Sequence, residues 1–252
     1  LINDNICIKI AGLYTGDNKT TLIEIGCGEG AITKHLAKLD YLKYDVIEID
    51  ERCINITKDN LLLNNLNLDN INFYNLDFLK FDFSKLKNIS VVSNLPYHLS
   101  GKFLRLIIDN KNIEEVVVTL QKEVVDNIVS TKLNLLSALI KLNFEINEIH
   151  LIKKGNFRPI PKVDSKVVHL IRKKDNFDNI FIEKFTKFLK FCFSQKRKTL
   201  TNNLLTSFSR DDIEKVLESI SISTNVRAED LSLNQLEQIF RAISTKDSAH
   251  SV

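Results

Sequence analysis

The sequence predicts a doubly wound α/β domain with a mostly parallel sheet and an antiparallel edge, followed by a small all-helical domain. Short runs rich in Val and Ile recur along the first part of the chain, and segments with helical periodicity separate them. Beyond about Arg172 the strand-like runs stop and apolar residues recur at helical spacing. We therefore expect one domain over residues 1–174 and a second over residues 175–252.

Five apolar runs are typical of buried parallel strands, and each is followed by helical patterning. They lie at residues 20–25, 44–49, 71–74, 89–92 and 114–120. Two further candidate strands, residues 148–152 and 166–171, have no clear helix between them, which predicts an antiparallel pair at the edge of the sheet. The loop that joins them contains Pro159 and Pro161 and should be extended.

Three helices are predicted in the second domain. Residues 181–192 carry apolar side chains at i, i+4, i+7, i+8 and i+11, and residues 213–220 repeat this one-sided pattern. Ser232 and Gln235 have the spacing of a capping box, which predicts the start of a last helix.

The first predicted strand ends in Glu24-Ile25 and is followed by Gly26, Gly28 and Gly30 at alternate positions. Glycines here permit a tight turn and the close approach of a ligand to the backbone, although a purely structural turn is the alternative interpretation. Glu48 lies about 20 residues further on, at the end of the second strand, where a carboxylate can accept hydrogen bonds from ribose hydroxyls. Neighbouring Asp50 could instead cap the next helix.

The third strand ends before Asp77 and Phe78. Asp77 is placed to accept a hydrogen bond from an adenine amino group, with Phe78 beside the ring, whereas an ordinary turn aspartate is the alternative. Since carboxyl ends of parallel strands meet at one crevice, acidic and glycine signals at three successive strand ends favour a ligand site there.

The fourth strand is followed by Asn94-Leu95-Pro96-Tyr97, a sequence suited to chemistry on an exocyclic amino group. The Asn94 side-chain oxygen and the Leu95 carbonyl can accept from the two N–H groups of an adenine amino group, which localises its lone pair. Pro96 stiffens the turn, and Tyr97 offers a flat face on which a base can stack. The alternative is an ordinary strand-to-turn junction.

Bulk properties narrow the class of protein. The formal net charge is +3, which is mild for a nucleic-acid binder, and 44% of residues are apolar, enough for a full core. Four cysteines without C-x-x-C spacing predict neither a zinc site nor disulfides. We expect no membrane span and no secretion signal. The absence of Met predicts that a segment precedes Leu1 in the full protein.

Together these residues resemble the S-adenosylmethionine-dependent ribosomal RNA adenine N6,N6-dimethyltransferases. The glycine loop, Glu48, Asp77 and residues 94–97 carry the part that many methyltransferases share. Three later segments are more specific to the family and extend the resemblance over nearly the whole chain. They are LQKEV at 120–124, FRPIPKVDS at 157–165 and FSQKRKTLTNNL at 193–204.

The resemblance implies a Rossmann-like class I methyltransferase domain that uses S-adenosyl-L-methionine and no metal. It implies dimethylation of two adjacent adenosines near the 3' end of small-subunit ribosomal RNA by a cytoplasmic or organellar monomer, with a role in ribosome biogenesis. The catalytic loop would be Asn94, Leu95, Pro96 and Tyr97, with Phe157 as the second wall of the base pocket. The implied cofactor contacts are Leu1, Glu24, Gly26, Gly28, Gly30, Glu48, Ile49, Asp77, Phe78 and Asn94.

One departure from the family keeps alternatives open. Residues 130–135 lack the Tyr-Gly usual in the small-subunit enzymes and form a shorter segment, as in the related large-subunit enzymes that confer macrolide resistance. A large-subunit adenine methyltransferase is therefore one alternative. A non-catalytic RNA-binding assembly or transcription factor on the same fold is another, although the intact residues 94–97 and Glu48 argue against lost chemistry.

Overall fold

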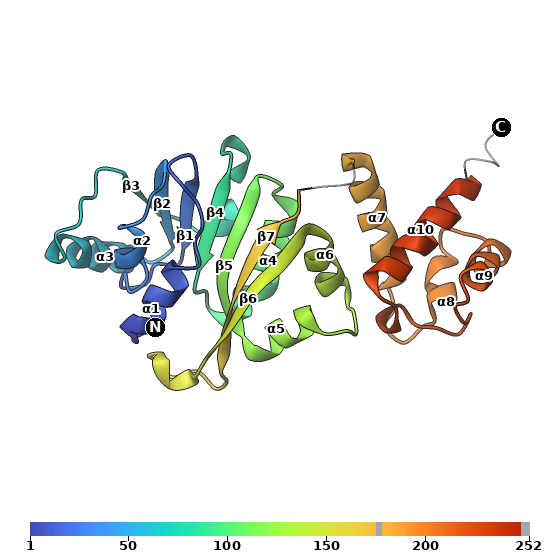
Figure 1. The fold of residues 1–252 in the computed structure, drawn as a ribbon. Helices are drawn as coiled ribbons and strands as arrows, with labels where there is room; N and C mark the ends of the chain where they lie inside the picture. Colours follow the sequence, from blue (N-terminus) through green and yellow to red (C-terminus); the bar gives the residue numbers. More distant parts are fainter. Residues whose placement is uncertain (175–177, 248–252) are drawn as a thin grey trace. The chain divides into compact units, whose positions relative to one another are not determined.

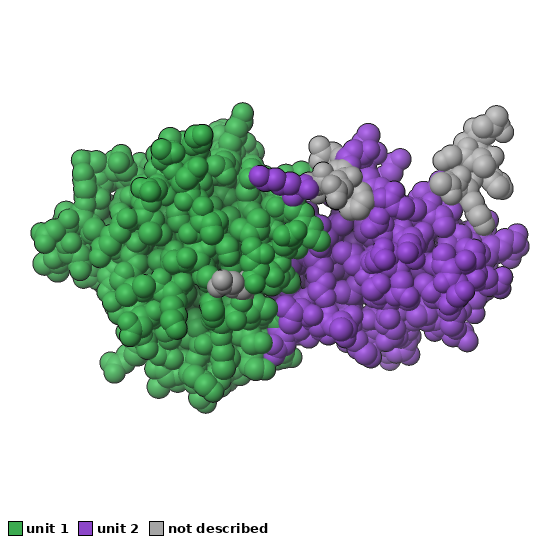
Figure 2. Space-filling model, in the orientation of Figure 1, with its two compact units in different colours: residues 1–125, 144–173 green, residues 126–143, 174–252 purple. Residues whose placement is uncertain are grey.

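The computed structural model describes residues 1–174 and 178–247, which form two compact units (Figure 2). The first unit comprises Leu1–Val125 and Phe144–Lys173, and the second comprises Asp126–Asn143 and Lys174–Val252. The expected division at residue 174 therefore placed residues 126–143 in the wrong unit. These residues contain α6 (Leu135–Asn143), which packs against two helices of the second unit, and the Leu133 N–H donates to the Glu229 carbonyl at 3.1 Å.

A seven-stranded sheet forms the centre of the first unit (Figure 1). Its order is β3 (Ile71–Asn75), β2 (Lys43–Glu48), β1 (Thr21–Ile25), β4 (Ile89–Ser93), β5 (Ile113–Gln121), β7 (Ser165–Arg172) and β6 (Phe144–Ile152). The first five strands are parallel, and β7 runs antiparallel to both β5 and β6. The predicted α/β sheet with an antiparallel edge is confirmed, but β6 begins at Phe144, well before the expected residue 148.

The helices of the first unit precede, connect or follow the five parallel strands. They are α1 (Asp4–Ala11), α2 (Thr33–Leu36), α3 (Glu51–Leu63), α4 (Ser100–Asp109) and the start of α5 (Lys122–Val129). Short 3₁₀ turns follow strand ends at η1 (Phe78–Lys80), η2 (Phe83–Lys85), η3 (Tyr97–Leu99) and η4 (Lys154–Asn156). The helix α1 precedes the first strand and was not predicted.

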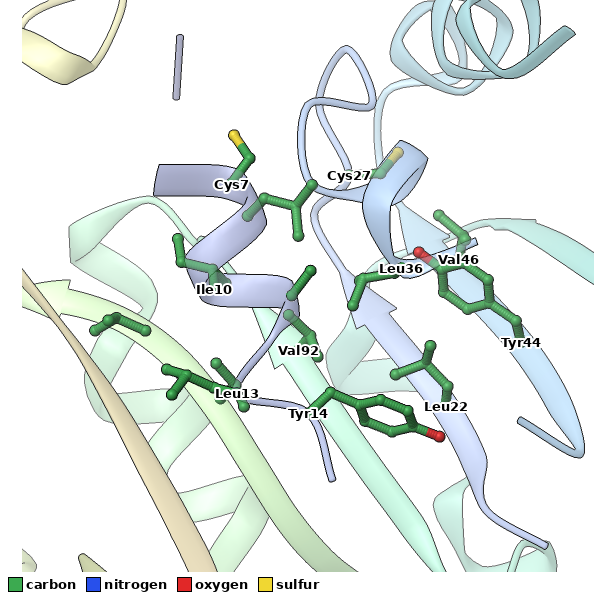
Figure 3. Close-up of a cluster of buried hydrophobic side chains, with 14 of the residues drawn as sticks. Cys7, Ile10, Leu13, Tyr14, Leu22, Cys27, Leu36, Tyr44, Val46 and Val92 are labelled. Carbon is green, nitrogen blue, oxygen red and sulfur yellow. The ribbon is translucent and has the colours of Figure 1, made fainter. Parts of the chain in front are cut away.

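One face of the sheet is covered by α1 and α2, and the side chains between them form a closed apolar layer (Figure 3). Ile10 of α1, Leu22 of β1 and Leu36 of α2 are fully buried there. Burial of such side chains contributes roughly 1.5–3 kcal/mol each. Because the glycine segment joins β1 to α2, this layer fixes both of its ends.

The second unit is helical. Besides α6 it contains α7 (Asn179–Cys192), α8 (Leu200–Leu204), α9 (Arg210–Ser219), η5 (Ala228–Asp230) and α10 (Leu233–Asp247). Phe240 of α10 packs against Phe185 and Phe188 of α7, with ring centroids 5.3 and 5.4 Å apart. The predicted capping box is present, since the Gln235 N–H donates to Ser232 Oγ and the Ser232 N–H donates to Gln235 Oε1.

Candidate functional site

The strand register brings four loops to the same edge of the sheet. Ile25 at the end of β1 pairs with Ile47 of β2 and with Ser93 of β4, and Glu48 pairs with Asn75 of β3. The loops that begin at residues 26, 49, 76 and 94 therefore leave the sheet side by side, as expected for a ligand crevice in a doubly wound fold.

The glycine loop has a backbone conformation that side chains disfavour. Gly26, Gly28 and Gly30 have φ of 79°, 55° and 83°. A Cβ on Gly30 would lie 3.1 Å from Thr57, whereas one on Gly28 would meet no atom within 4 Å. The loop thus needs glycine at Gly30 for close packing and leaves open space at Gly28.

The helix α3 holds the glycine loop in place. Thr57 Oγ1 donates to the Gly28 carbonyl and Asn60 Nδ2 donates to the Glu29 carbonyl, both at 2.9 Å. Asn64, the C-cap residue of α3, lines a cavity beside the loop. These three residues were not predicted as part of the site, although their spacing places three polar side chains on one helical face.

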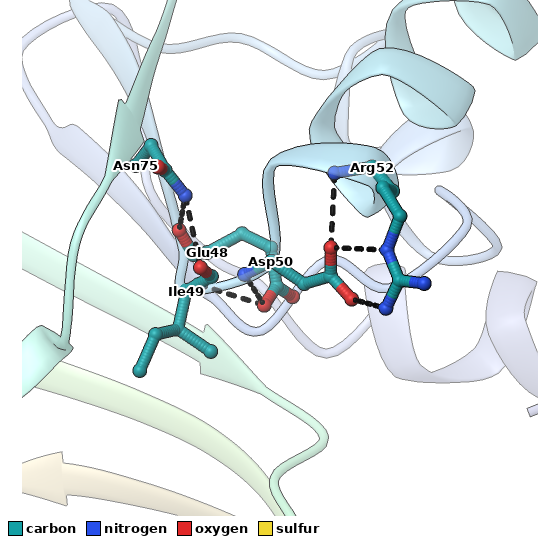
Figure 4. Close-up of polar contacts among 5 residues, drawn as sticks. All are labelled: Glu48, Ile49, Asp50, Arg52 and Asn75. Atoms are coloured by element: carbon teal, nitrogen blue, oxygen red, sulfur yellow. Dashed lines mark hydrogen bonds and ion pairs between the residues drawn. The ribbon is translucent and has the colours of Figure 1, made fainter.

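Glu48 is fixed by backbone donors (Figure 4). Its Oε1 accepts from the N–H groups of Ile49 and Asp50 at 2.7 and 3.0 Å, and its Oε2 accepts from the Gly28 N–H at 3.2 Å. Asp50 instead caps α3, accepting from the Arg52 N–H and pairing with the Arg52 guanidinium at 2.6 Å. The choice of Glu48 over Asp50 as the residue of the crevice therefore fits the geometry.

A first cavity of about 450 Å³ lies along the ends of β1, β2, β3 and β4. Gly26, Gly28, Glu48, Ile49, Asp77, Phe78 and Asn94 line it, as do Leu95, Pro96 and His98. Ile49 is 71% exposed, whereas Phe78 is buried with its ring edge-on to Phe103. Asp77 caps η1 by accepting from the Leu79 N–H at 3.0 Å. The cavity thus offers apolar walls and two carboxylates.

A second cavity of about 750 Å³ adjoins the first and shares Gly26, Gly28 and Asn94 with it. Its further lining includes Leu1 and Gly30, both expected as cofactor contacts, and also Lys34 and Arg158, which were not expected. Lys34 pairs with Asp4 of α1 at 2.7 Å, and hydrogen bonds from Lys34 and His35 lower the pKa of Asp4 to about 2.

Asn94 lies at the junction of the two cavities. It follows β4 directly, is half-buried, and has no hydrogen-bond partner for its side chain among the described residues. Leu95 is buried beside it and Pro96 is exposed. An amide held at the end of a strand with unused donors and acceptor is available to a ligand.

Three expected site residues do not line either cavity. Glu24 is 2% exposed and accepts a hydrogen bond from Tyr44 instead of facing a cavity. Tyr97 is half-buried, and its Oη shares a hydrogen bond with Ser165 Oγ at 2.7 Å. Phe157 is 8% exposed and belongs to the apolar layer between the sheet and α1.

Packing explains the positions of Glu24 and Phe157. Successive side chains of a strand point to opposite faces of the sheet. The Glu24 side chain therefore points into the layer beneath α1 and α2, and the side chain of Ile25, next to the glycine loop, points to the other face. Phe157 anchors the loop between β6 and β7 by packing against residues of the apolar layer that are remote in sequence. Such a contact cannot be predicted from the local sequence. In the part of the chain that the structure describes, no three His, Cys, Asp or Glu side chains gather as a metal site, and no helix is long and apolar enough to cross a membrane.

The sheet order, the glycine loop after β1, the carboxylate after β2 and the amide-bearing loop after β4 define a Rossmann-like methyltransferase. Solved structures agree on the fold. The 23S rRNA methyltransferase ErmE superposes with a TM-score of 0.81 over 97% of this chain and 99% of its own, at 21% identity. A dimethyladenosine transferase from Plasmodium falciparum superposes with a TM-score of 0.82 over 98% of both chains, at 26% identity.

Sequence comparison assigns the chain to a family. Residues 1–245 match the ribosomal RNA adenine dimethylase family. The ribosomal RNA small subunit methyltransferase A of Mycoplasmopsis pulmonis is 36% identical over 95% of this chain and 94% of its own length. The enzyme of the same name from Malacoplasma penetrans is 35% identical over 92% and 84%. The protein therefore belongs to the ribosomal RNA adenine dimethylases and is a methyltransferase.

Proposed function

We propose that the protein transfers methyl groups from S-adenosylmethionine to N6 of adenosines in small-subunit ribosomal RNA, twice per base. The position of Asn94 carries this proposal, because its unpaired amide lies where the two cavities meet. The relatives named small subunit methyltransferase A support the choice of RNA.

The first cavity fits the adenosine half of the cofactor. A carboxylate has about four acceptor sites, and Glu48 uses three of them on backbone N–H groups, so it is held rigidly and can still accept from a ribose hydroxyl. Ile49 and Phe78 supply apolar walls for a purine, and Asp77 can accept from its amino group. The bound cofactor supplies a methyl group already activated on a sulfonium.

The loop after β4 would orient the target base. Asn94 Oδ1 and the Leu95 carbonyl accept from the two N–H groups of the target amine, which directs its lone pair toward the first cavity. Placing the nitrogen at near-attack distance contributes more than a general base would, since the amine can lose its proton after transfer. Tyr97, whose Oη is hydrogen-bonded to Ser165, lines neither cavity. It would stack on the extruded base only after neighbouring residues move and expose its ring.

Two further assignments belong to this proposal. The target is a pair of adjacent adenosines near the 3' end of the RNA, modified during ribosome biogenesis. The helical unit would contact the RNA through Lys196, Arg197 and Lys198, which are exposed in the turn after α7. Buried Asn203 holds that turn, donating to the carbonyls of Cys192 and Gln195 at 2.7 and 3.1 Å.

Methyl transfer from labelled cofactor to unmethylated small and large ribosomal subunits, assayed separately, tests the proposal. Dimethyladenosine in the small-subunit RNA is the expected product. Label only in the large-subunit RNA would reassign the substrate, and cofactor binding without transfer to either RNA would favour a non-catalytic assembly role.

Asn94→Ala tests the role of the loop in the same assay. We expect transfer to be lost while cofactor affinity stays within about tenfold, roughly 1.4 kcal/mol. Asn147→Ala is the matched control, because Asn147 is an exposed amide on β6 that lines neither cavity. Full activity of Asn94→Ala would refute the proposed orientation of the amine.

A further inference from the structure

Arg158 is a cation on the wall of the second cavity without a partner of its own. It is exposed, it lines the cavity together with Leu1 and Asn94, and no described residue pairs with its guanidinium. Lys34 lines the same cavity, but Asp4 already neutralises it at 2.7 Å. Glu29 lines the cavity from the glycine loop, which leaves Arg158 as the lining cation that no described carboxylate neutralises.

The loop that carries Arg158 is tied down on three sides. Phe157 is buried in the apolar layer, and the Lys154 N–H donates to Asp164 Oδ1 at 2.9 Å. The N-terminal segment binds the same loop, since the Ile2 N–H donates to the Asn156 carbonyl at 2.8 Å. Arg158 is therefore presented from a fixed backbone, which lowers the entropy lost when it binds a ligand.

The charge of this loop indicates what that ligand is. Residues 153–164 contain Lys153, Lys154, Arg158 and Lys162 against a single carboxylate, Asp164. All four cations are exposed, and the one ion pair that they make with described residues, Lys153 with Asp164 at 4.0 Å, is of the weak surface kind. A strip of exposed cations beside a cavity is typical of a contact to a polyanion rather than to one small carboxylate.

We propose that Arg158 binds the RNA phosphate next to the target adenosine, and that Lys154 and Lys162 extend this contact along the same strand. The inference rests on the proposed function and adds a positioning residue for the nucleotide. Arginine suits this position, because its planar fork can bind a phosphate through two parallel hydrogen bonds. The phosphate contact would hold the nucleotide while its base enters beside Asn94.

Arg158→Gln and Arg158→Lys test the proposal, with Lys87→Gln as the matched control. Lys87 is exposed just before β4, at the opposite end of that strand from Asn94. Affinity for unmethylated small ribosomal subunits is measured over a range of salt concentrations, and cofactor affinity is measured separately. We expect Arg158→Gln to weaken subunit binding about fivefold and to reduce the slope of log K against log salt by about 0.7–0.9.

The other variants should behave differently. Arg158→Lys should restore the salt slope but only part of the affinity, and Lys87→Gln should leave both close to wild type. Cofactor affinity should change less than about twofold in Arg158→Gln. An equal loss of cofactor affinity would instead assign Arg158 to the carboxylate of the methyl donor and overturn the proposal.

Two more results would overturn it. If Arg158→Gln weakens subunit binding but leaves the salt slope unchanged, Arg158 only shapes the loop. If Arg158→Gln leaves subunit binding unchanged, Arg158 makes no contact with a phosphate. Failure of the proposed function is visible separately, since the wild-type protein would then not methylate small subunits, whatever the variants show in the binding measurement.

Discussion

Tyr44 Oη donates a hydrogen bond to Glu24 Oε2 at 2.5 Å beneath the glycine loop. Both side chains are buried, with Tyr44 at 0% and Glu24 at 2% exposure. Burial raises the pKa of Glu24 to about 7, and the hydrogen bond from Tyr44 opposes only part of that rise. Glu24, which was expected to contact the cofactor, is thus a buried residue whose hydrogen bond to Tyr44 links β1, the strand before the glycine loop, to β2.

Glu24→Gln should flatten part of the pH dependence of stability. The native state keeps the Glu24 proton up to about pH 7, whereas the unfolded chain loses it near 4.5. The contribution of Glu24 is therefore fully present below 4.5 and is lost as pH rises to about 7, by roughly 3 kcal/mol in total. Urea unfolding of both proteins across this range measures the difference, and parallel stability curves would contradict the assignment.

Gly28→Ala should separate the fold from cofactor binding. Because Gly28 has a φ of 55°, alanine there costs about 1–2 kcal/mol of stability, although its Cβ meets no protein atom. The methyl group would project into space where the cavities meet, so we expect cofactor affinity to fall by more than about tenfold. Calorimetric titration with S-adenosylmethionine measures this loss.

Gly101→Ala is the control for that measurement. Gly101 lies in the first turn of α4, and a Cβ there also meets no atom within 4 Å. Alanine should stabilise the protein by about 0.4–1 kcal/mol and leave the cofactor affinity unchanged. Equal cofactor affinity in both variants would show that the ligand does not approach Gly28 closely.

Local patterns predicted the parts of this protein that local chemistry determines. Apolar runs predicted the strands, and residues at or just beyond the carboxyl ends of those strands, such as Glu48, Asp77 and Asn94, do line the crevice. Phe157 and Tyr97 differ, because contacts with the apolar layer and with Ser165, remote in sequence, fix their positions. Arg158 was overlooked for the same reason, since only the folded loop brings it to a cavity.

Tyr97 and Ser165 should act as one unit in methyl transfer. Tyr97→Phe keeps the ring but removes its hydrogen bond to Ser165 Oγ. We therefore expect kcat/KM to fall roughly fivefold, which corresponds to a loss of about 1 kcal/mol of transition-state stabilisation. Tyr97→Ala also removes the stacking face and should cost about 1–3 kcal/mol more. Single-turnover transfer to small subunits measures these losses.

The double variant decides whether the hydrogen bond carries the effect. Ser165→Ala should match Tyr97→Phe, and combining the two should add little further loss, because they remove the same interaction. Fully additive losses would mean that the two residues act independently and that Ser165 does not orient the ring.

Phe157 is the residue whose two possible roles predict opposite outcomes. If it is mainly an anchor, Phe157→Ala should lower the free energy of unfolding by about 3–5 kcal/mol, because it leaves a cavity in the buried layer. Phe157→Leu should then lose about 1 kcal/mol and retain most of its transfer activity. If Phe157 turns toward the target base during catalysis, the leucine variant should keep its stability and its cofactor affinity but lose transfer, since leucine offers no aromatic face. Because the ring is 8% exposed and packs in the apolar layer, we expect the first outcome in chemical denaturation and single-turnover assays on the same preparations.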